Sequence, residues 1–205
     1  MPEDHYFTAH PASDGELRRV PVRLAGREVE VVTAGGVFSP GGLDRGTRVL
    51  LAEVPPPPAE GAFLDLGCGW GPLALTLALQ SPEATVQAVD VNERALDLCR
   101  RNARTLGCTR LVASTPDEVD PDTGYDLIWS NPPIRVGKAV LHGMLTTWLR
   151  RLAAGGTAYL VVQKNLGGDS LQAWLARTLP DLMDPVTVAR EATSKGFRVL
   201  RVTRA

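Results

Sequence analysis

The sequence lacks a long apolar run and is poor in cysteine. No stretch approaches the roughly 20 apolar residues that a membrane-spanning helix requires, so we expect no membrane partner. The N-terminal Met1-Pro2-Glu3-Asp4-His5 is polar and acidic, unlike a secretory signal. The three cysteines, Cys68, Cys99 and Cys108, are odd in number and lack metal-ligand spacing. We therefore expect reduced thiols, no metal, and a cytoplasmic location.

An excess of basic charge is also missing. The chain has 22 Lys and Arg residues against 23 Asp and Glu residues, a formal net charge of -1. Proteins that bind nucleic acid through their whole surface usually carry a basic excess. Any contact with RNA is therefore expected from a local patch or a small substrate region.

The 205 residues favour one domain over 1–205, in which an N-terminal extension, 1–58, precedes a core, 59–205. In the extension, period-two alternation on both sides of Ala25-Gly26-Arg27 predicts a β-hairpin. Pro21 predicts an edge strand, because proline cannot donate to a ladder of hydrogen bonds. The run from Pro55 to Pro58 predicts a short stiff connector.

From Ala62 onward, strand patterns alternate with helix patterns. We predict strands over 62–66, 85–90, 110–113, 125–130 and 157–163, helices over 72–80, 92–106, 138–154 and 170–178, and a final hairpin over 185–192 and 197–203. Gly155-Gly156 is predicted to end the third of these helices. The predicted fold class is α/β: a Rossmann-like, doubly wound, seven-stranded sheet with an antiparallel C-terminal hairpin and an N-terminal β-hairpin extension.

A glycine-rich turn, Asp65 to Gly71, follows the first strand of the core. Glycines there allow a ligand to approach bare backbone. In a dinucleotide site, spaced G-x-G-x-x-G, the third glycine would come one residue later than Gly71. Asp65 can accept from the amino end of a methionine-derived ligand, whereas it would repel a pyrophosphate. The turn therefore favours S-adenosylmethionine over a nicotinamide dinucleotide, with a purely structural turn as the alternative.

A second acid, Asp90, ends the next predicted strand. In nucleotide-binding sheets an acid about 20 residues past the glycines binds the ribose hydroxyls, and Asp90 has that position. A simple strand-end turn is the alternative. Asn92 is better explained as a helix cap than as a ligand.

The motif Asn131-Pro132-Pro133-Ile134 follows the strand over 125–130, where ligands of such sheets bind. Two prolines stiffen the backbone and remove two donors. The Asn131 side-chain oxygen and the Pro132 carbonyl remain as acceptors for the two hydrogens of an amino group. Because a sulfonium methyl is already electrophilic, the motif predicts methyl transfer to a planar amino or amide nitrogen by positioning. A turn without function is the alternative.

Several further stretches complete a pattern that extends over nearly the whole chain. They are His5-Tyr6-Phe7, Gly36-Val37-Phe38-Ser39, Leu43-Asp44-Arg45-Gly46-Thr47, Asp65 to Gly71, Asp90-Val91-Asn92, Ser130 to Ile134 with Arg135, Gly137-Lys138, His142 and Gly196-Phe197-Arg198-Val199-Leu200. Together they resemble the small-subunit ribosomal RNA guanine-N2 methyltransferases, the ribosomal RNA methyltransferase C group, in a short single-domain form.

The resemblance implies an S-adenosylmethionine-dependent N-methyltransferase that releases S-adenosylhomocysteine and methylates guanine N2 in ribosomal or other structured RNA. The cofactor-binding residues expected on these grounds are Phe38, Asp65, Gly67, Cys68, Gly69, Gly71, Asp90, Val91, Asn92, Ser114 and Asn131. Asn131, Pro132, Pro133 and Ile134 are expected to be catalytic, and Phe38, Arg135 and Lys138 to bind substrate. Ser39 and Asp44 are expected to flank the cofactor pocket. RNA or a ribosomal particle is the expected partner.

Three departures from the family pattern keep alternatives open. The duplicated N-terminal half that helps larger members hold RNA is absent, Ser114-Thr115-Pro116 stands where an acid is common, and Ile134 stands where an aromatic residue is common. Methylation of a glutamine amide in a protein, methylation of adenine in DNA, and a cofactor-binding module without turnover are the alternatives. Monomer and homodimer are both open.

Two weaker signals concern the helix predicted from Lys138. His142 lies on the same helical face as Lys138 and is expected to pack or cap rather than catalyse. Trp148 and Trp174 are expected to be core or helix-packing residues.

Overall fold

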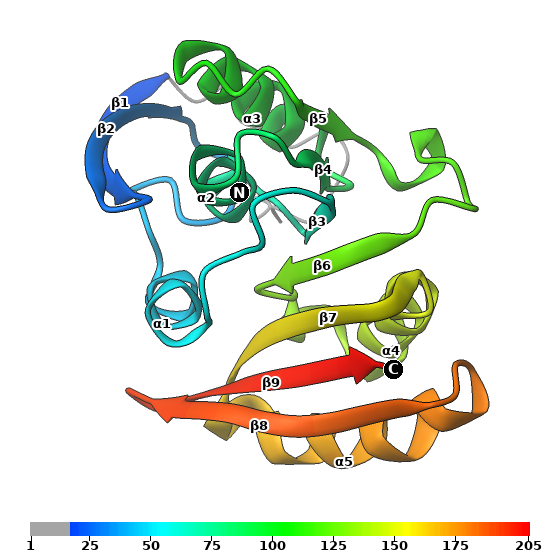
Figure 1. The fold of residues 1–205 in the computed structure, drawn as a ribbon. Coiled ribbons are helices and arrows are strands. Elements are labelled where there is room, and N and C mark those ends of the chain that lie inside the picture. Colours follow the sequence, from blue (N-terminus) through cyan, green and yellow to red (C-terminus); the bar gives the residue numbers. More distant parts are fainter. Residues whose placement is uncertain (1–16) are drawn as a thin grey trace.

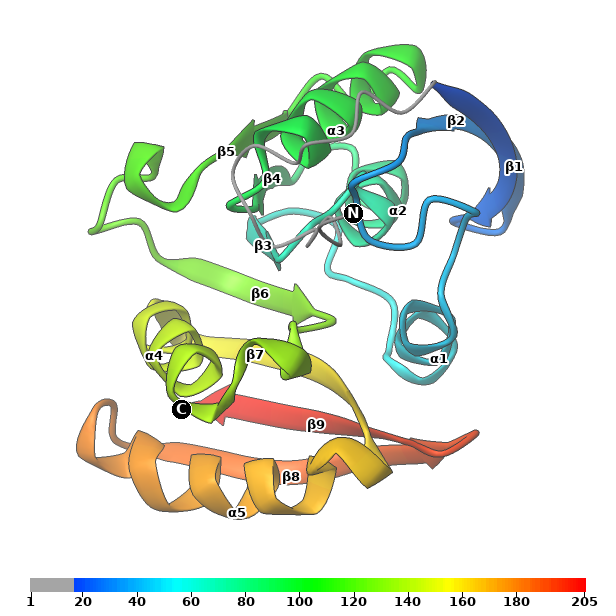
Figure 2. The same cartoon turned by 180° about the vertical axis from the view of Figure 1, so that it is seen from behind.

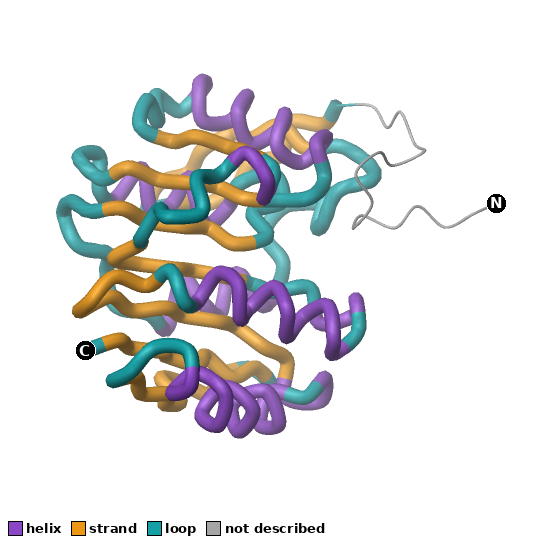
Figure 3. The backbone as a smooth tube through the Cα atoms, turned by 90° about the vertical axis from the view of Figure 1, so that its right-hand side faces the viewer, coloured by secondary structure: helices purple, strands orange, loops and turns teal. Residues whose placement is uncertain are grey.

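The computed structural model describes residues 17–205. Its main sheet contains β3 (Ala62–Leu66), β4 (Thr85–Val89), β5 (Leu111–Ser114), β6 (Tyr125–Ser130), β7 (Leu152–Gln163), β8 (Val186–Ser194) and β9 (Phe197–Arg204). The strands lie in the order β5-β4-β3-β6-β7-β9-β8 and form one continuous stack (Figure 3). β3 to β7 are parallel, and β9 runs antiparallel to both β7 and β8. The predicted fold class is confirmed.

Helices cover both faces of this sheet (Figures 1 and 2). They are α1 (Arg45–Glu53), α2 (Pro72–Gln80), α3 (Glu93–Thr105), α4 (Lys138–Leu149) and α5 (Gly168–Thr178). Short 3₁₀ turns span Pro116–Glu118, Ile134–Val136, Lys164–Leu166 and Leu179–Asp181.

Alternation along β3 shows how the two faces divide the core. Phe63 packs with apolar residues of α1, α2 and α3, whereas Leu64 and Leu66 pack with those of α4 and α5. Side chains of a strand point to opposite faces in turn, so neighbouring residues enter different cores. A strand that is apolar at both kinds of position must be covered on both sides.

The N-terminal hairpin pairs β1 (Arg18–Leu24) with β2 (Arg27–Thr33) and lies beside α2 and α3 (Figure 1). Its apolar face, which includes Val22 and Val31, packs on Trp70, Leu75 and Leu98. Within residues 17–205, β1 pairs with β2 alone, so Pro21 stands on an edge strand as predicted. The extension therefore packs on the core through apolar side chains.

Asn102, near the end of α3, ties the hairpin to the core. Its Oδ1 accepts from the backbone N–H of Val32 at 2.7 Å, and its Nδ2 donates to the carbonyls of Val32 at 3.0 Å and Trp70 at 3.1 Å. The side chain is buried. An amide can satisfy three backbone groups at once because it carries both a donor and an acceptor.

Two predictions about helices are wrong. No helix was predicted before residue 62, yet Arg45–Glu53 forms α1. The helix predicted over 138–154 ends at Leu149, and Gly155-Gly156 lies within β7 rather than after a helix. The strand predicted over 157–163 begins five residues early, at Leu152, and the remaining predicted strands and helices are present with ends shifted by at most two residues.

A bulge explains why β7 begins so early. The register between β6 and β7 shifts after Tyr125, which pairs with Leu152, so that Leu127 pairs with Thr157. At Gly156 an added Cβ would lie 2.9 Å from the carbonyl oxygens of Ala153 and Tyr125. Glycine is required there by close backbone approach, not as a helix stop.

None of the helices within residues 17–205 is both long and apolar enough to span a membrane.

Replacing Asn102 should loosen the hairpin. Asn102→Ala leaves buried backbone groups of Val32 and Trp70 without partners, which should lower the free energy of unfolding by about 1–3 kcal/mol. Urea unfolding measures the change. The matched control is Arg101→Ala on the same helix, which removes only an exposed ion pair with Asp97 and should change stability by less than about 0.5 kcal/mol. Equal effects from the two variants would contradict the role of Asn102.

Candidate active site

A cavity of about 440 Å³ opens at the carboxyl ends of β3, β4, β6 and β7, where loops of parallel sheets form binding sites. A second pocket of about 20 Å³ has walls of its own, among them Asp65, Thr47 and Trp70. The two share Phe38, Asp44, Gly67, Gly69 and Asn131, so they are parts of one depression.

Asp65 is the most deeply buried acid of this depression. One of its oxygens, Oδ2, accepts from the backbone N–H of Ala74 at 2.8 Å, at the start of α2. The other, Oδ1, is buried and has no partner. Burial raises the pKa of the Asp65 carboxyl from 3.8 to about 8, the Ala74 bond opposes the rise, and the charge of Asp90 adds to it. The side chain is thus a buried acceptor that lacks a donor.

The glycine turn after β3 is held by hydrogen bonds to the last residue of β4. The N–H groups of Gly67 and Cys68 donate to the carbonyl of Val89 at 2.8 and 3.0 Å. Gly67 and Gly69 have φ values of +77° and +55°, which glycine adopts without strain. Both line the two pockets, so the turn presents bare backbone to a ligand.

Asp90 braces the same turn from the end of β4. Its Oδ2 accepts from the N–H of Gly69 at 2.8 Å, and its Oδ1 accepts from the N–H of Asn92 at 2.9 Å. Burial raises the pKa of Asp90, and these backbone bonds partly offset the rise. Because each carboxylate oxygen has two lone pairs, Asp90 can still accept from a ligand in the cavity that it lines.

Asn92 has the capping role that its sequence position predicts. Its Oδ1 accepts from the N–H groups of Arg94 and Ala95 at 3.1 and 3.3 Å, at the start of α3. Its Nδ2 donates to the carbonyl of Gly36 at 2.9 Å and so fixes the loop before Phe38. Asn92 contributes to the cavity wall while its polar atoms hold the protein together.

Asn131 receives its orientation from the N-terminal segment. Its Nδ2 donates to both carboxylate oxygens of Asp44 and to Oγ1 of Thr47, each at 3.2 Å. A carboxylate only accepts, so the nitrogen end of the amide must face Asp44. Oδ1 of Asn131 has no hydrogen-bond partner within residues 17–205. The acceptor end of the amide is therefore the one left for a ligand.

The same carboxylate caps α1. Asp44 accepts from the N–H groups of Gly46 at 2.8 Å and Thr47 at 3.1 Å. At Gly46 an added Cβ would lie 3.1–3.2 Å from Asp44 and Asn131, so the approach is close. Thr47 and the capping role of Asp44 were missed, because α1 was not predicted. The signal was present as an aspartate, a common N-cap residue, that precedes an apolar run.

Apart from Arg135 and Gln163, the rest of the cavity wall is apolar. Ile134, Met144, Trp148, Leu166 and Phe197 line it, and sequence reasoning assigned a site role only to the first. Trp148, expected in the core, is 4% exposed and serves both core and wall. Phe197 reaches the wall because the register of β7 and β9 places it opposite Gln163, another wall residue.

His142 packs rather than lining the cavity, as predicted. Its ring stacks on Trp174 with centroids 3.7 Å apart and planes 9° apart. Burial lowers the pKa of His142, and the positive charge of Lys138 lowers it further.

Most of the predicted site residues come together in this depression. The main cavity contains Phe38, Gly67, Gly69, Asp90, Val91, Asn92, Asn131, Pro132, Pro133, Ile134 and Arg135, and the narrower pocket contains Asp65, Cys68 and Ser39. Gly71, Ser114 and Lys138 line neither pocket. His5-Tyr6-Phe7 lies outside the described residues.

Two of the residues outside the pockets have other reasons for their positions. A Cβ at Gly71 would lie 2.7 Å from Sγ of Cys99, so the third glycine allows α2 and α3 to pack closely. Ser114 pairs with Val89 at the end of β5, and Pro116, two residues later, reaches the cavity instead.

Cys68 lines the narrower pocket as a neutral thiol. A hydrogen bond to Cys99 and burial raise the pKa of Cys68, which keeps this thiol neutral.

The family model of the methyltransferase small domain matches residues 28–201. The chain belongs to this family. As a member it is an S-adenosylmethionine-dependent methyltransferase, and the expected cofactor is confirmed at this level.

Relatives of this methyltransferase differ in length. It is 32% identical over 204 residues to uncharacterized protein YbxB of Bacillus subtilis, covering 98% of each chain. It is 32% identical over 206 residues to ribosomal RNA small subunit methyltransferase C of Pseudomonas entomophila, covering 98% of this chain and 58% of that protein. Across the relatives of that name it spans between 40% and 58% of their length.

A solved structure of similar fold is the T. thermophilus 16S rRNA N2 methyltransferase RsmC in complex with AdoMet and guanosine. It superposes with a TM-score of 0.75 at 22% identity and covers 96% of this methyltransferase and 53% of that chain. The resemblance inferred from the sequence is confirmed by these relatives.

The buried Asp65 should make the stability of the ligand-free methyltransferase depend on pH. A carboxyl whose pKa rises on folding binds more protons in the folded state than in the unfolded state. The free energy of unfolding should therefore fall as pH rises from about 4 to the folded pKa of about 8, and this contribution should level off above it.

Asp65→Asn separates this contribution from that of all other groups. An amide oxygen can still accept from Ala74 but does not ionise. Urea unfolding of both proteins between pH 5 and pH 8 should show the variant gaining stability relative to the wild type as pH rises. A difference that stays constant across this range would show that Asp65 does not carry the dependence.

Proposed function

We propose that this methyltransferase transfers the methyl group of S-adenosylmethionine to an exocyclic amino nitrogen, guanine N2 in ribosomal or other structured RNA. The observation that carries the proposal is the fixed orientation of Asn131. Its Nδ2 is held by Asp44 and Thr47, so its Oδ1 is left as an acceptor. Asn131 lines the same cavity as the glycine turn and Asp90.

The residues of the depression fit the proposed cofactor. The unpartnered Oδ1 of Asp65 is suited to accept from the ammonium of the methionine end, and the backbone of Gly67 and Gly69 to lie against that end. Asp90 is suited to accept from ribose hydroxyls. When bound, S-adenosylmethionine supplies an electrophilic methyl on a sulfonium.

Two acceptors of the chain position the amino group. One is Oδ1 of Asn131, and the other is the carbonyl of Pro132, which accepts from no backbone N–H within residues 17–205. The next carbonyl, that of Pro133, accepts from Val136 at 3.3 Å and is already used. Two acceptors that grip two N–H groups turn the nitrogen lone pair outward and stabilise positive charge that develops on nitrogen.

The apolar wall suits a flat base. Ile134 offers apolar contact where an aromatic residue is common in the family, and Phe38 and Phe197 add aromatic surface to the same cavity. Aromatic and apolar side chains cover bases that are splayed out of RNA. The choice of guanine N2 rests on the names of the relatives, the ribosomal RNA small subunit methyltransferase C of Pseudomonas entomophila and the N2 methyltransferase of T. thermophilus.

The RNA partner is part of the proposal. The chain spans between 40% and 58% of the length of these ribosomal RNA small subunit methyltransferases C, and the proposal of RNA or a ribosomal particle as partner rests on their names. A cytoplasmic location and a single domain over 1–205 belong to the same proposal.

Asp44 acts as a positioning residue in this mechanism. Asp44→Asn keeps a capping side chain of equal preference but offers one acceptor oxygen where the carboxylate offers two. The amide of Asn131 can then turn its oxygen toward the new amide, away from the substrate. The kcat should fall about tenfold or more, as for other misplaced catalytic groups. The KM for S-adenosylmethionine should stay within about threefold of the wild-type value, since the change alters the orientation of the Asn131 amide and not the binding of the cofactor.

The control for Asp44→Asn is Arg45→Gln, an exposed change in the first turn of α1 that leaves Asn131 untouched. Its kcat should equal that of the wild type. Thermal unfolding of both variants checks that α1 is retained. A wild-type kcat in Asp44→Asn would remove Asp44 from the mechanism.

The substrate is tested with tritiated S-adenosylmethionine and total RNA or total protein from cells that lack the gene, followed by nucleoside analysis. Label should appear in RNA as N2-methylguanosine. Asn131→Ala should abolish transfer while calorimetry shows cofactor binding within a few fold of the wild type. Label in protein alone would overturn the RNA substrate, and label in another nucleoside would overturn guanine N2.

A further inference from the structure

The lysines of this chain have an uneven distribution. The sequence contains 22 basic residues, of which only Lys138, Lys164 and Lys195 are lysines. Lys138 begins α4 after the Asn-Pro-Pro loop, Lys164 directly follows β7, and Lys195 stands in the turn between β8 and β9. Because β8 runs parallel to β7, all three lie at the edge of the sheet where the cavity opens.

Each lysine is close in the chain to a residue of the cavity wall. Lys164 follows Gln163, Lys195 precedes Phe197 by two residues, and Lys138 follows Arg135 by three. The backbone N–H of Lys164 donates to the carbonyl of Gly196 at 2.9 Å, so two of the lysines are on segments joined directly. The three lysines and Arg135, here called the basic rim, therefore border the cavity mouth.

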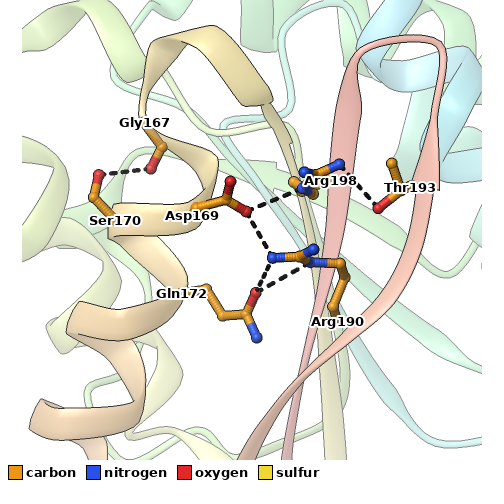
Figure 4. Close-up of polar contacts among 7 residues, drawn as sticks. All are labelled: Gly167, Asp169, Ser170, Gln172, Arg190, Thr193 and Arg198. Carbon is orange, nitrogen blue, oxygen red and sulfur yellow. Dashed lines mark hydrogen bonds and ion pairs between the residues drawn. The ribbon is translucent and has the colours of Figure 1, made fainter.

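The charges of the rim are not neutralised by ion pairs. All four side chains are exposed, and every ion pair found within residues 17–205 uses arginine other than Arg135. The acid near Lys164 is Asp169, whose Oδ1 is shared by Arg190 at 2.6 Å and Arg198 at 3.0 Å (Figure 4). One negative charge set against two arginines leaves this region positive.

The same network holds the rim in place. Asp169 is on α5, Arg190 is on β8, and Arg198 is on β9, where it also donates to Oγ1 of Thr193 at 3.0 Å (Figure 4). Arg198 is 8% exposed, whereas the side chains of Asp169 and Arg190 are 53% and 40% exposed, so the brace runs from a buried arginine to the surface. The turn that carries Lys195 is thus fixed to the helix that follows Lys164.

The sign of charge changes along the edge of the sheet. The segments after β4 and β5 carry Glu93, Asp117 and Glu118 beside one arginine, Arg94, whereas the basic rim follows β6, β7 and β8. A polyanion that reaches the cavity is therefore attracted from the β6–β8 side and repelled from the other. The overall charge of -1 offers no general attraction to a polyanion, so attraction must come from local patches such as the basic rim.

We propose that the basic rim binds the phosphates that flank the target nucleotide of a structured RNA and thereby directs its base into the cavity. The inference rests on the proposed function, because it takes RNA as the substrate. Lysine suits this task as a point charge with three donors that adapts to phosphate oxygens.

The test removes the lysine charges and measures RNA binding. The variant K138Q/K164Q/K195N keeps the turn between β8 and β9, because Lys195 has a φ of +48° and asparagine tolerates this conformation. The matched control, R18Q/R150Q/R177Q, removes three exposed charges that belong neither to the rim nor to any ion pair within residues 17–205. The probe is a fluorescent small-subunit ribosomal RNA transcript, with S-adenosylhomocysteine present.

The lysine variant should bind the transcript at least about tenfold more weakly at low salt, because three phosphate contacts are lost. The slope of log Kd against log salt concentration should decrease by about two, at roughly 0.7–0.9 per lost contact. In the control, the slope should differ from that of the wild type by no more than the value of about one phosphate contact, roughly 0.7–0.9. Calorimetry should show unchanged S-adenosylmethionine affinity in both variants, since none of the substituted residues lines the cavity.

The outcomes separate this inference from the proposed function. If the wild type methylates RNA and the two triple variants show equal affinities and slopes, the basic rim is overturned while the proposed function stands. If RNA is methylated and only the lysine variant loses affinity and slope, both stand. If label enters protein alone and the transcript is not bound, both are overturned.

Discussion

The contact of Asp44 with Asn131 is the interaction on which the candidate site depends. One carboxylate caps α1 and holds the nitrogen end of the Asn131 amide, so the start of a helix and the Asn-Pro-Pro loop share a single anchor. A carboxylate has no donor, and the amide therefore has only one orientation that makes a bond. In the proposed mechanism the N-terminal segment does more than cover the core, because it decides which atom of Asn131 meets the substrate.

Asp65 shows that the protein tolerates an unfavourable group where its ligand is proposed to bind. Its Oδ1 is buried without a donor, and burial raises the pKa of the carboxyl to about 8. Leaving a buried acceptor unsatisfied costs about 1–3 kcal/mol, which a cationic ligand could recover on binding. Both carboxylate oxygens of Asp90 accept from backbone N–H groups, so Asp90 has no unsatisfied acceptor and holds the glycine turn without a ligand.

Much of the fold was predictable, and the errors have local causes. The short apolar segments 62–66 and 72–80 have the predicted bounds, and both are buried in the core. The end of α4 was wrong because Gly155-Gly156 resembles a helix stop, whereas Gly156 lies in a bulge where two carbonyl oxygens leave no room for a Cβ. α1 was missed although Asp44 precedes an apolar run, a pattern that indicates the start of a helix.

The sequence by itself determined the cofactor class and the candidate loop, because glycine spacing, Asp65 and Asn131-Pro132-Pro133 act through backbone geometry and chemistry that adjacent residues carry. Only the tertiary structure decided which atom of Asn131 is free, that Phe197 reaches the wall, and that three lysines distant in sequence gather at one mouth. These depend on pairings between segments up to 87 residues apart. Strand order and register set those pairings, and one-dimensional patterns do not specify them.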